Sequence, residues 1–338
     1  DVAELRWVGA TASFPVWAYA SDATPGSTVT VAFPAGYETT VEAGDIPAPT
    51  KDGSGRTIYR TGRLATPLKF FAYLVGDRPG AYTERDLTTT VGDASVPLTI
   101  KAWADDATWG KRVGALVQRA LPTMGKAIGL PWPRDDTLVI QEAVSRSTGG
   151  YAGLFDPTQG LVEVAYYADD FVVLHESAHG WFNGSLLADR WANEAFASYY
   201  AVLAAEALDV PASAGELTKA LRASEIPLNA WGPVGKETTA VEDFAYAATL
   251  VLARQIAERA GPDGLRAVWA DASGRVGAYQ PPLASVGPAE GATTGTTGLE
   301  TVTGPPDWRG LLDLLEANTT ATYDDLWRTW VARDTDLP

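Results

Sequence analysis

The chain contains only two histidines, and both fall within the pentapeptide His175-Glu176-Ser177-Ala178-His179. Residues four apart share one face of a helix, so two imidazoles at this spacing can bind a single zinc ion. The glutamate between them would lie beside a zinc-bound water, where it can act as the general base. This H-E-x-x-H pattern therefore predicts a zinc hydrolase that binds one Zn2+ per chain.

A catalytic zinc site usually has three protein ligands, so one ligand is still missing. No third histidine exists and the chain has no cysteine, which leaves a carboxylate. Asp189 and Glu194 are the candidates that follow the histidines. Glu194 lies near the start of a predicted helix over residues 191–208, whereas Asp189 is placed to cap that helix. We expect Glu194 to be the third ligand, with Asp189 as the alternative.

Composition limits the classes of protein that this sequence can represent. A formal net charge of −16 argues against a nucleic-acid partner, because phosphate binding needs a basic surface. The longest apolar run, over residues 244–253, is too short to span a bilayer. The chain begins at Asp1 without a start methionine, so a signal or anchor outside the given segment is compatible with it. Together with the absence of cysteine and a Thr/Gly-rich loop, this leads us to expect an extracytoplasmic location.

The pattern of the chain changes near residue 102 and predicts an α+β protein with two domains. Residues 1–102 show strand-like alternation broken by turns, which predicts a small β-sandwich-like domain. Residues 103–338 are mostly helical, with a small β lobe made of a strand at 137–140 and a hairpin at 149–167. The Gly/Pro/Thr-rich stretch 274–306 is expected to be a long loop. Helices are expected over 107–129, 170–182, 191–208, 214–223, 240–260, 263–272, 307–317 and 322–334.

Two stretches of the sequence carry a family resemblance. H-E-S-A-H-G-W-F-N-G at 175–184, followed by N-E-A-F-A-S-Y at 193–199, resembles the aminopeptidase-N-like gluzincins, whose pattern is H-E-x-x-H-x-W-F-x-N and then N-E-G-F-A-x-Y. The resemblance covers most of the chain and implies a thermolysin-like catalytic domain that cleaves a peptide or protein substrate. It also implies that His175, His179 and Glu194 bind zinc and that Glu176 is the base.

The family also has a tyrosine that stabilises the transition state, in a Y-x-K-G setting. Tyr246 occupies the matching place in F-A-Y-A-A-T-L at 244–250, where the Lys-Gly pair is replaced by Ala248 and Thr249. The resemblance therefore implies that Tyr246 donates a hydrogen bond to the developing oxyanion. The alternative is a tyrosine that only packs on an apolar helix face.

The sequence departs from the family in the region that binds substrate. The spacing from His179 to Glu194 is shorter than the family's by about one helical turn. The family's exopeptidases carry G-x-M-E-N before the zinc helix, and its Glu binds the substrate's α-amine. The equivalent stretch here, 149–155, has no Glu, so we expect cleavage that does not need a free N-terminus. Gly149, Gly150, Tyr151 and Gly153 are expected to line the bound peptide, although glycines here also suit a plain hairpin.

Two other functions stay open at this level. The first is an aminopeptidase whose amine anchor comes from elsewhere in the chain. The second is a catalytically inactive domain of the same fold that binds or scaffolds other proteins. The presence of Glu176 argues against the second, because a scaffold has no use for a general base.

Overall fold

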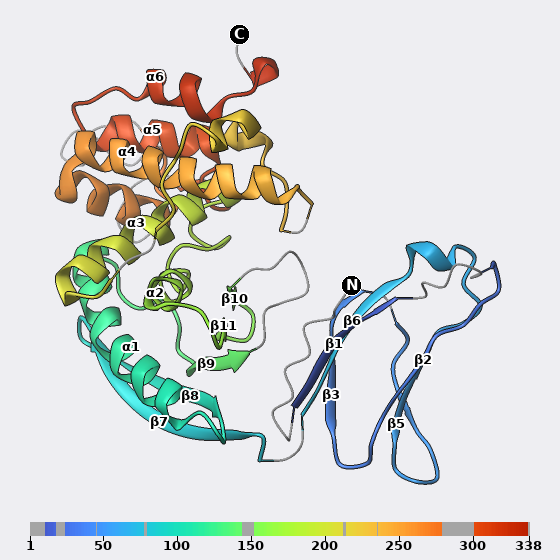
Figure 1. The fold of residues 1–338 in the computed structure, drawn as a ribbon. Helices are drawn as coiled ribbons and strands as arrows, with labels where there is room; N and C mark the ends of the chain where they lie inside the picture. The colour runs from blue at the N-terminus through green and yellow to red at the C-terminus, as the bar shows by residue number, and fades with distance from the viewer. Residues whose placement is uncertain are drawn as a thin grey trace, which may run out of the picture.

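In the computed structural model, residues 11–17, 24–44, 46–77, 80–143, 152–211, 214–234, 236–278 and 301–336 are described (Figure 1). The N-terminal part contains two three-stranded antiparallel sheets. The first has the order β1 (Thr11–Trp17), β6 (Phe71–Asp77), β3 (Glu38–Gly44), and the second β2 (Thr30–Phe33), β5 (Thr57–Arg60), β4 (Thr50–Lys51). Their strands share a small apolar core, formed by Phe33, Ile46, Tyr59, Ala72 and Leu74.

A five-stranded sheet supports the helical part of the molecule. Its order is β10 (Gly153–Asp156), β11 (Leu161–Ala165), β9 (Leu138–Ala143), β8 (Ala94–Trp103) and β7 (Tyr82–Val91). The predicted hairpin and the predicted strand before it are therefore present, and β9 runs parallel to both β8 and β11.

The sheet pairing corrects the expected domain boundary. A division at residue 102 would cut through β8, which pairs with β9 beyond that division. The pairing instead groups residues from Tyr82 onward with the helical part. Alternating apolar residues predict a strand but not the strand with which it pairs, so the sequence alone does not show that β7 and β8 belong to the sheet of the helical part.

The first long helix, α1 (Ala107–Ile128), packs across β7 and β8 (Figure 1). Asp106 caps it by accepting a hydrogen bond from the backbone of Trp109 at 3.0 Å, and Gly129 ends it with a left-handed φ of 81°. The residues of the predicted apolar face are buried against the sheet, which confirms the helix: Val113, Leu116, Val117 and Leu121.

The remaining helices are α2 (Asp170–Ala178), α3 (Arg190–Leu208), α4 (Thr239–Gly274), α5 (Trp308–Asn318) and α6 (Asp324–Leu326), which continues as a π-helix over Trp327–Val331. Of these, α2 and α3 pack on α1, α4 packs on α3, and α5 packs on α4. α4 bends at Gly261, where φ is 67° and Pro262 follows, so the two expected helices form one kinked element. The helix expected at 214–223 is wrong, because the described residues there form only the 3-10 turn Leu221–Ser224.

Aromatic side chains hold the central helices together. Phe182 stacks on Tyr200 of α3 with ring centroids 5.2 Å apart, and Trp269 of α4 meets Phe196 of α3 edge to face at 4.5 Å. The indole nitrogen of Trp269 also donates a hydrogen bond to the hydroxyl of Tyr200 at 2.8 Å. These contacts fix α3 and α4 beside the end of α2, where both histidines lie.

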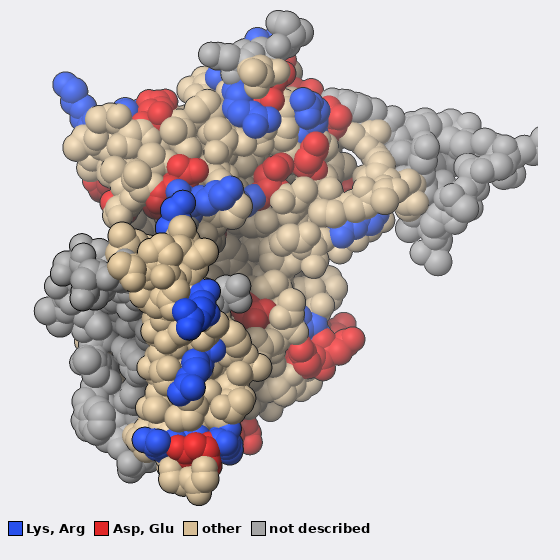
Figure 2. All heavy atoms as spheres, turned by 90° about the vertical axis from the view of Figure 1, so that its right-hand side faces the viewer, with Lys and Arg blue, Asp and Glu red and all other residues tan. Residues whose placement is uncertain are grey.

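Charged side chains are mixed over the visible surface. In Figure 2, Lys and Arg form a short column over the N-terminal part, and both signs alternate over the helical part. Of the helices in the described part of the chain, none is both long enough and apolar enough to cross a membrane.

Candidate metal centre

The helix α2 carries the predicted motif, but its ends differ from expectation. Its N-cap is Asp169, whose carboxylate accepts a hydrogen bond from the backbone of Val172 at 3.2 Å, and Asp170, where the helix was expected to begin, forms an ion pair with Arg112. The helix ends at Ala178, so His179 is the C-cap residue. The chain still turns helically there, because the backbone N–H of His179 bonds to the carbonyl of His175 at 3.3 Å.

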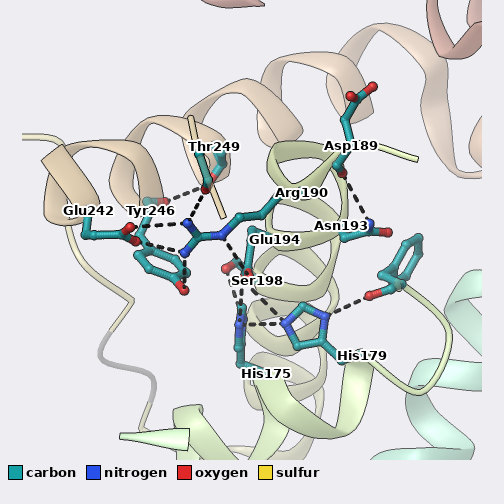
Figure 3. A network of polar contacts seen from close by, with 12 residues as sticks. His175, His179, Asp189, Arg190, Asn193, Glu194, Ser198, Glu242, Tyr246 and Thr249 are labelled. Atoms are coloured by element: carbon teal, nitrogen blue, oxygen red, sulfur yellow. Dashed lines mark hydrogen bonds and ion pairs between the residues drawn. The ribbon is translucent and has the colours of Figure 1, made fainter. Parts of the chain in front are cut away.

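The structure brings the three expected ligands together from two helices. Nε2 of His175 lies 3.1 Å from Nε2 of His179 and 3.1 Å from Oε2 of Glu194, and Nε2 of His179 lies 3.4 Å from the same oxygen (Figure 3). Within the described residues, these three form the only group of acidic, histidine or cysteine side chains that could hold a metal ion. All three side chains are nearly buried.

The separations between the donor atoms fit one zinc ion. Zinc–ligand distances of about 2.0–2.1 Å in a tetrahedral arrangement place neighbouring donors about 3.3 Å apart. The observed separations of 3.1, 3.1 and 3.4 Å bracket this value. Asp189, the alternative third ligand, is not part of the group.

The hydrogen bonds behind the two imidazoles orient them for a metal. Nδ1 of His179 lies 2.7 Å from the carbonyl oxygen of Phe182, which can only accept, so this nitrogen carries the proton. In the neutral imidazole, Nε2 of His179 is then left as a lone-pair donor toward the site. Nδ1 of His175 lies 3.1 Å from the hydroxyl of Ser198 on α3, and if this hydroxyl accepts the Nδ1 proton, Nε2 of His175 is a second lone-pair donor. Two lone pairs that face each other repel unless a cation lies between them.

The charges of the site also favour a bound cation. The carboxylate of Glu194 is fully desolvated, which would raise its pKa, yet the two imidazoles hold this pKa well below its usual range. Burial would lower the pKa of His179, but Glu194 outweighs burial and raises it to about 9. The group therefore stabilises positive charge at its centre.

Glu176 lies on α2 between the two histidines and faces the same space. It is 7% exposed, and this burial raises its pKa even though both imidazoles oppose the effect. The backbone N–H of Phe155 on β10 donates a hydrogen bond to the Glu176 carboxylate. A carboxylate with a raised pKa that is held by a strand can accept a proton and deliver it again.

The strand β10 begins at Gly153, which contacts Glu176 directly. A Cβ at position 153 would lie 2.6 Å from Cγ and 2.7 Å from Oε1 of Glu176, closer than real Cβ atoms come. Gly153 therefore allows the strand to approach the motif, and its expected contact with substrate stays a prediction. Gly149, Gly150 and Tyr151 lie outside the described residues, so their expected contact with substrate stays a prediction.

We predict that Gly153→Ala displaces Glu176 and lowers the rate of the proposed reaction by about 100-fold, because small misplacements of a catalytic group cost this much. Zinc binding should persist, because the atoms nearest to the added Cβ belong to Glu176 and Val172 and not to the three expected zinc ligands. Gly184→Ala is the matched control, because a Cβ there meets nothing within 4 Å. Equal rates for the two variants in a peptide cleavage assay would contradict this role of Gly153.

Tyr246, the expected oxyanion donor, lies on α4 opposite the histidines. Its ring meets that of His175 at a centroid distance of 6.4 Å, and its hydroxyl accepts a hydrogen bond from Nη2 of Arg190 at 3.3 Å (Figure 3). Burial raises the pKa of Tyr246 well above its usual value. The hydroxyl therefore keeps its proton and can donate it in a hydrogen bond.

Sequence reasoning missed Arg190, which links Tyr246 to the ligand helix. Its guanidinium bonds both carboxylate oxygens of Glu242 at 2.8 and 3.2 Å, lies 3.8 Å from the ring centroid of Trp231, and approaches Oε1 of Glu194 at 3.9 Å. A usable signal was present, because Arg190, Glu194 and Ser198 are spaced four apart and share one face of α3. Glu242 could not be paired with Arg190 from the sequence, since 52 residues separate them.

Asp189 holds the N-cap position of α3, but its side chain makes no capping hydrogen bond. Burial raises its pKa, and the backbone N–H of Trp308 donates to its carboxylate. The expected capping role is therefore wrong in detail, because Asp189 connects the start of α3 to the start of α5 instead.

Two pockets open on either side of Glu176. The first, here called the α2–α4 pocket, is bordered by Phe171, Val172 and Leu250 and has a volume of about 410 Å³. The second, here called the α3-side pocket, is bordered by Asn193 and Glu194 and has a volume of about 300 Å³. Both are bordered by Gly153, His175, Glu176 and Tyr246, so a chain that runs along β10 would pass the catalytic residues between them.

No protein-family model matches the chain, and no curated protein matches it. Solved structures do share its fold. The M1 zinc metallopeptidase from Deinococcus radiodurans is similar with a TM-score of 0.51 and 18% identity, over 99% of this chain and 74% of that chain. A mutant of that metallopeptidase from Deinococcus radiodurans has a TM-score of 0.51 and 19% identity, over 93% and 66%. A two-domain M1 zinc metallopeptidase mutant bound to L-arginine has a TM-score of 0.50 and 19% identity, with the same coverage.

These similarities show that the fold is that of M1 zinc metallopeptidases. The chain spans 66% of the length of the two mutant structures. The similarity to these structures agrees with the mixed α+β architecture. It also agrees with the family resemblance of the H-E-x-x-H sequence.

Proposed function

We propose that this protein is a zinc-dependent peptidase in which His175, His179 and Glu194 bind the metal ion. The main support is that two Nε2 atoms and one carboxylate oxygen lie within 3.4 Å of one another beside the buried Glu176. This is the spacing of neighbouring ligands around a tetrahedral zinc ion. The M1 fold and the thermolysin-like order of the motif along two packed helices support it.

Zinc, when bound, supplies Lewis acidity that acidifies a water and polarises a carbonyl group. Glu176 then takes the proton of the attacking water and passes it to the leaving amine. Burial favours this exchange, because a raised pKa makes the carboxyl a good donor after it has been a base. The backbone N–H of Phe155 favours the charged form of this carboxylate, which supports its part as a base.

Tyr246 stabilises the oxyanion that develops on the substrate carbonyl. Its hydroxyl keeps its proton, and its ring lies beside His175 in the group of expected zinc ligands (Figure 3). Arg190 fixes the hydroxyl oxygen, so the hydroxyl proton is free to point into the cleft. Such preorganised donors act most strongly in a site that excludes water.

Cleavage does not require a free substrate N-terminus in this proposal. The described part of β10 contains one acidic residue, Asp156, and its carboxylate is occupied by the turn that follows. It accepts hydrogen bonds from the hydroxyl of Thr158 at 2.6 Å and from the amide of Gln159 at 2.6 Å. The described part of β10 therefore offers main-chain groups to a peptide, without a free carboxylate of its own that could bind the α-amine.

Matched peptides test this proposal. Each sequence is supplied with a free or an acetylated N-terminus and incubated with zinc-loaded protein, and products are identified by mass spectrometry. We expect internal cleavage of both sets at similar rates. Trimming of the free set alone would establish the aminopeptidase alternative, and no cleavage of either set would establish an inactive domain.

A further inference from the structure

The α2–α4 pocket has three walls. α2 contributes Phe171 and Val172 one turn before His175 and Glu176, α4 contributes Ala247 and Leu250, and Leu221 closes the end. These side chains are apolar and half-buried or buried. A pocket of about 410 Å³ with this lining suits a long aliphatic side chain.

One charged side chain beyond the catalytic residues borders this pocket, namely Asp243 of α4. Asp243 precedes Tyr246 by three residues and Leu250 by seven, so all three lie on one face of the helix. The carboxylate is therefore about one helical turn, roughly 5 Å of rise, from the tyrosine that faces the zinc ligands.

The carboxylate of Asp243 is available to a ligand. Asp243 is exposed, and within the described residues its side chain has no hydrogen-bond or ion-pair partner. Its neighbour Glu242 differs, because it is buried and bound by Arg190. An apolar pocket with a carboxylate at its border matches a group with an aliphatic stem and a positive end.

We propose that Asp243 binds a cationic nitrogen group of the substrate in the α2–α4 pocket, and that it thereby sets a preference for basic peptides. This inference rests on the proposed peptidase function. A lysine or arginine side chain fits best, because its methylene stem would cover the apolar walls while its charge reaches Asp243. The α-amine at the N-terminus of a peptide carries the same charge, so it is the other group that Asp243 could bind.

The test uses alanine-based peptides amidated at the C-terminus, with one variable position that carries lysine, norleucine or glutamate. Norleucine keeps the aliphatic stem and lacks the charge. The variable position is moved along the peptide, and each peptide is made with a free and with an acetylated N-terminus. The readout is kcat/KM for the wild type, Asp243→Asn, Asp243→Lys and the control Glu258→Gln, an exposed carboxylate on the same helix outside the pocket.

We expect the wild type to prefer lysine over norleucine by about two- to fivefold at one position of the acetylated set, the range of an exposed ion pair. Asp243→Asn should remove this ratio, Asp243→Lys should shift it toward glutamate, and Glu258→Gln should keep it. Added salt should also reduce the ratio, because exposed charges are screened. If free peptides alone show the Asp243-dependent advantage, the bound cation is the α-amine.

A lysine-to-norleucine ratio near one in the wild type, with no advantage for free peptides, would overturn the role of Asp243. So would a ratio that persists in Asp243→Asn. These results are distinct from failure of the proposed function, in which the norleucine peptides are not cleaved either.

Discussion

Glu176→Gln is expected to lower kcat/KM for peptide cleavage by about 10³-fold, the contribution typical of a general base. The amide keeps the size of the side chain and can still occupy the space beside Gly153 and the N–H of Phe155. It cannot accept a proton from water at neutral pH. Steady-state kinetics with a zinc-loaded protein measure the effect, and zinc content is determined on the same sample.

Retained zinc is the control that gives this result its meaning. Glu176 faces the site but does not belong to the group of donor atoms, so the variant should bind one zinc ion as tightly as the wild type. Full activity in Glu176→Gln would show that another group is the base. Loss of zinc together with activity would show that Glu176 has a structural part in the metal site.

Replacing Glu194 should have an equally large effect through the metal itself. Glu194→Ala removes the one carboxylate that lies within 3.4 Å of both imidazoles. Removal of groups that merely orient ligands costs about 10–100-fold in metal affinity, so loss of a ligand should cost about 100-fold or more. The two histidines would then repel each other at close range. Competition with a zinc-binding dye measures the affinity.

Asp189→Asn is the matched comparison, because Asp189 is the other carboxylate that the sequence offers. It lies outside the donor group and is tied to the start of α5. The variant should keep both zinc affinity and activity. The reverse result, with zinc lost in Asp189→Asn and kept in Glu194→Ala, would assign the third ligand to Asp189.

The part of the site that lies on helix faces could be predicted from the sequence. Four-residue spacing places His175 and His179 on one side of α2, and a second helix close behind it has few ways to present Glu194. The contacts of Arg190 could not be predicted in this way. Its partners Glu242 and Trp231 come from segments far along the chain, and only the packing of α4 against α3 brings them together.

The same limit explains the errors in the fold. Most helices were found because their apolar periodicity is local, as in α1. The boundary expected at residue 102 separates β8 from β9, because strand pairing depends on contacts between residues far apart in sequence, here Leu98 with Leu138 on either side of α1. The 3-10 turn at Leu221–Ser224 replaced an expected helix where the chain instead forms the end wall of the α2–α4 pocket.

The most direct test of the central claim is a peptide-pool digest with one preparation of the wild-type protein, split into a metal-free and a zinc-reconstituted half. Products are read by mass spectrometry. The account predicts new cleavage products only in the half that holds one zinc ion per chain, with metal bound by His175, His179 and Glu194. Identical products in both halves, or no products in the half with stoichiometric zinc, would contradict it.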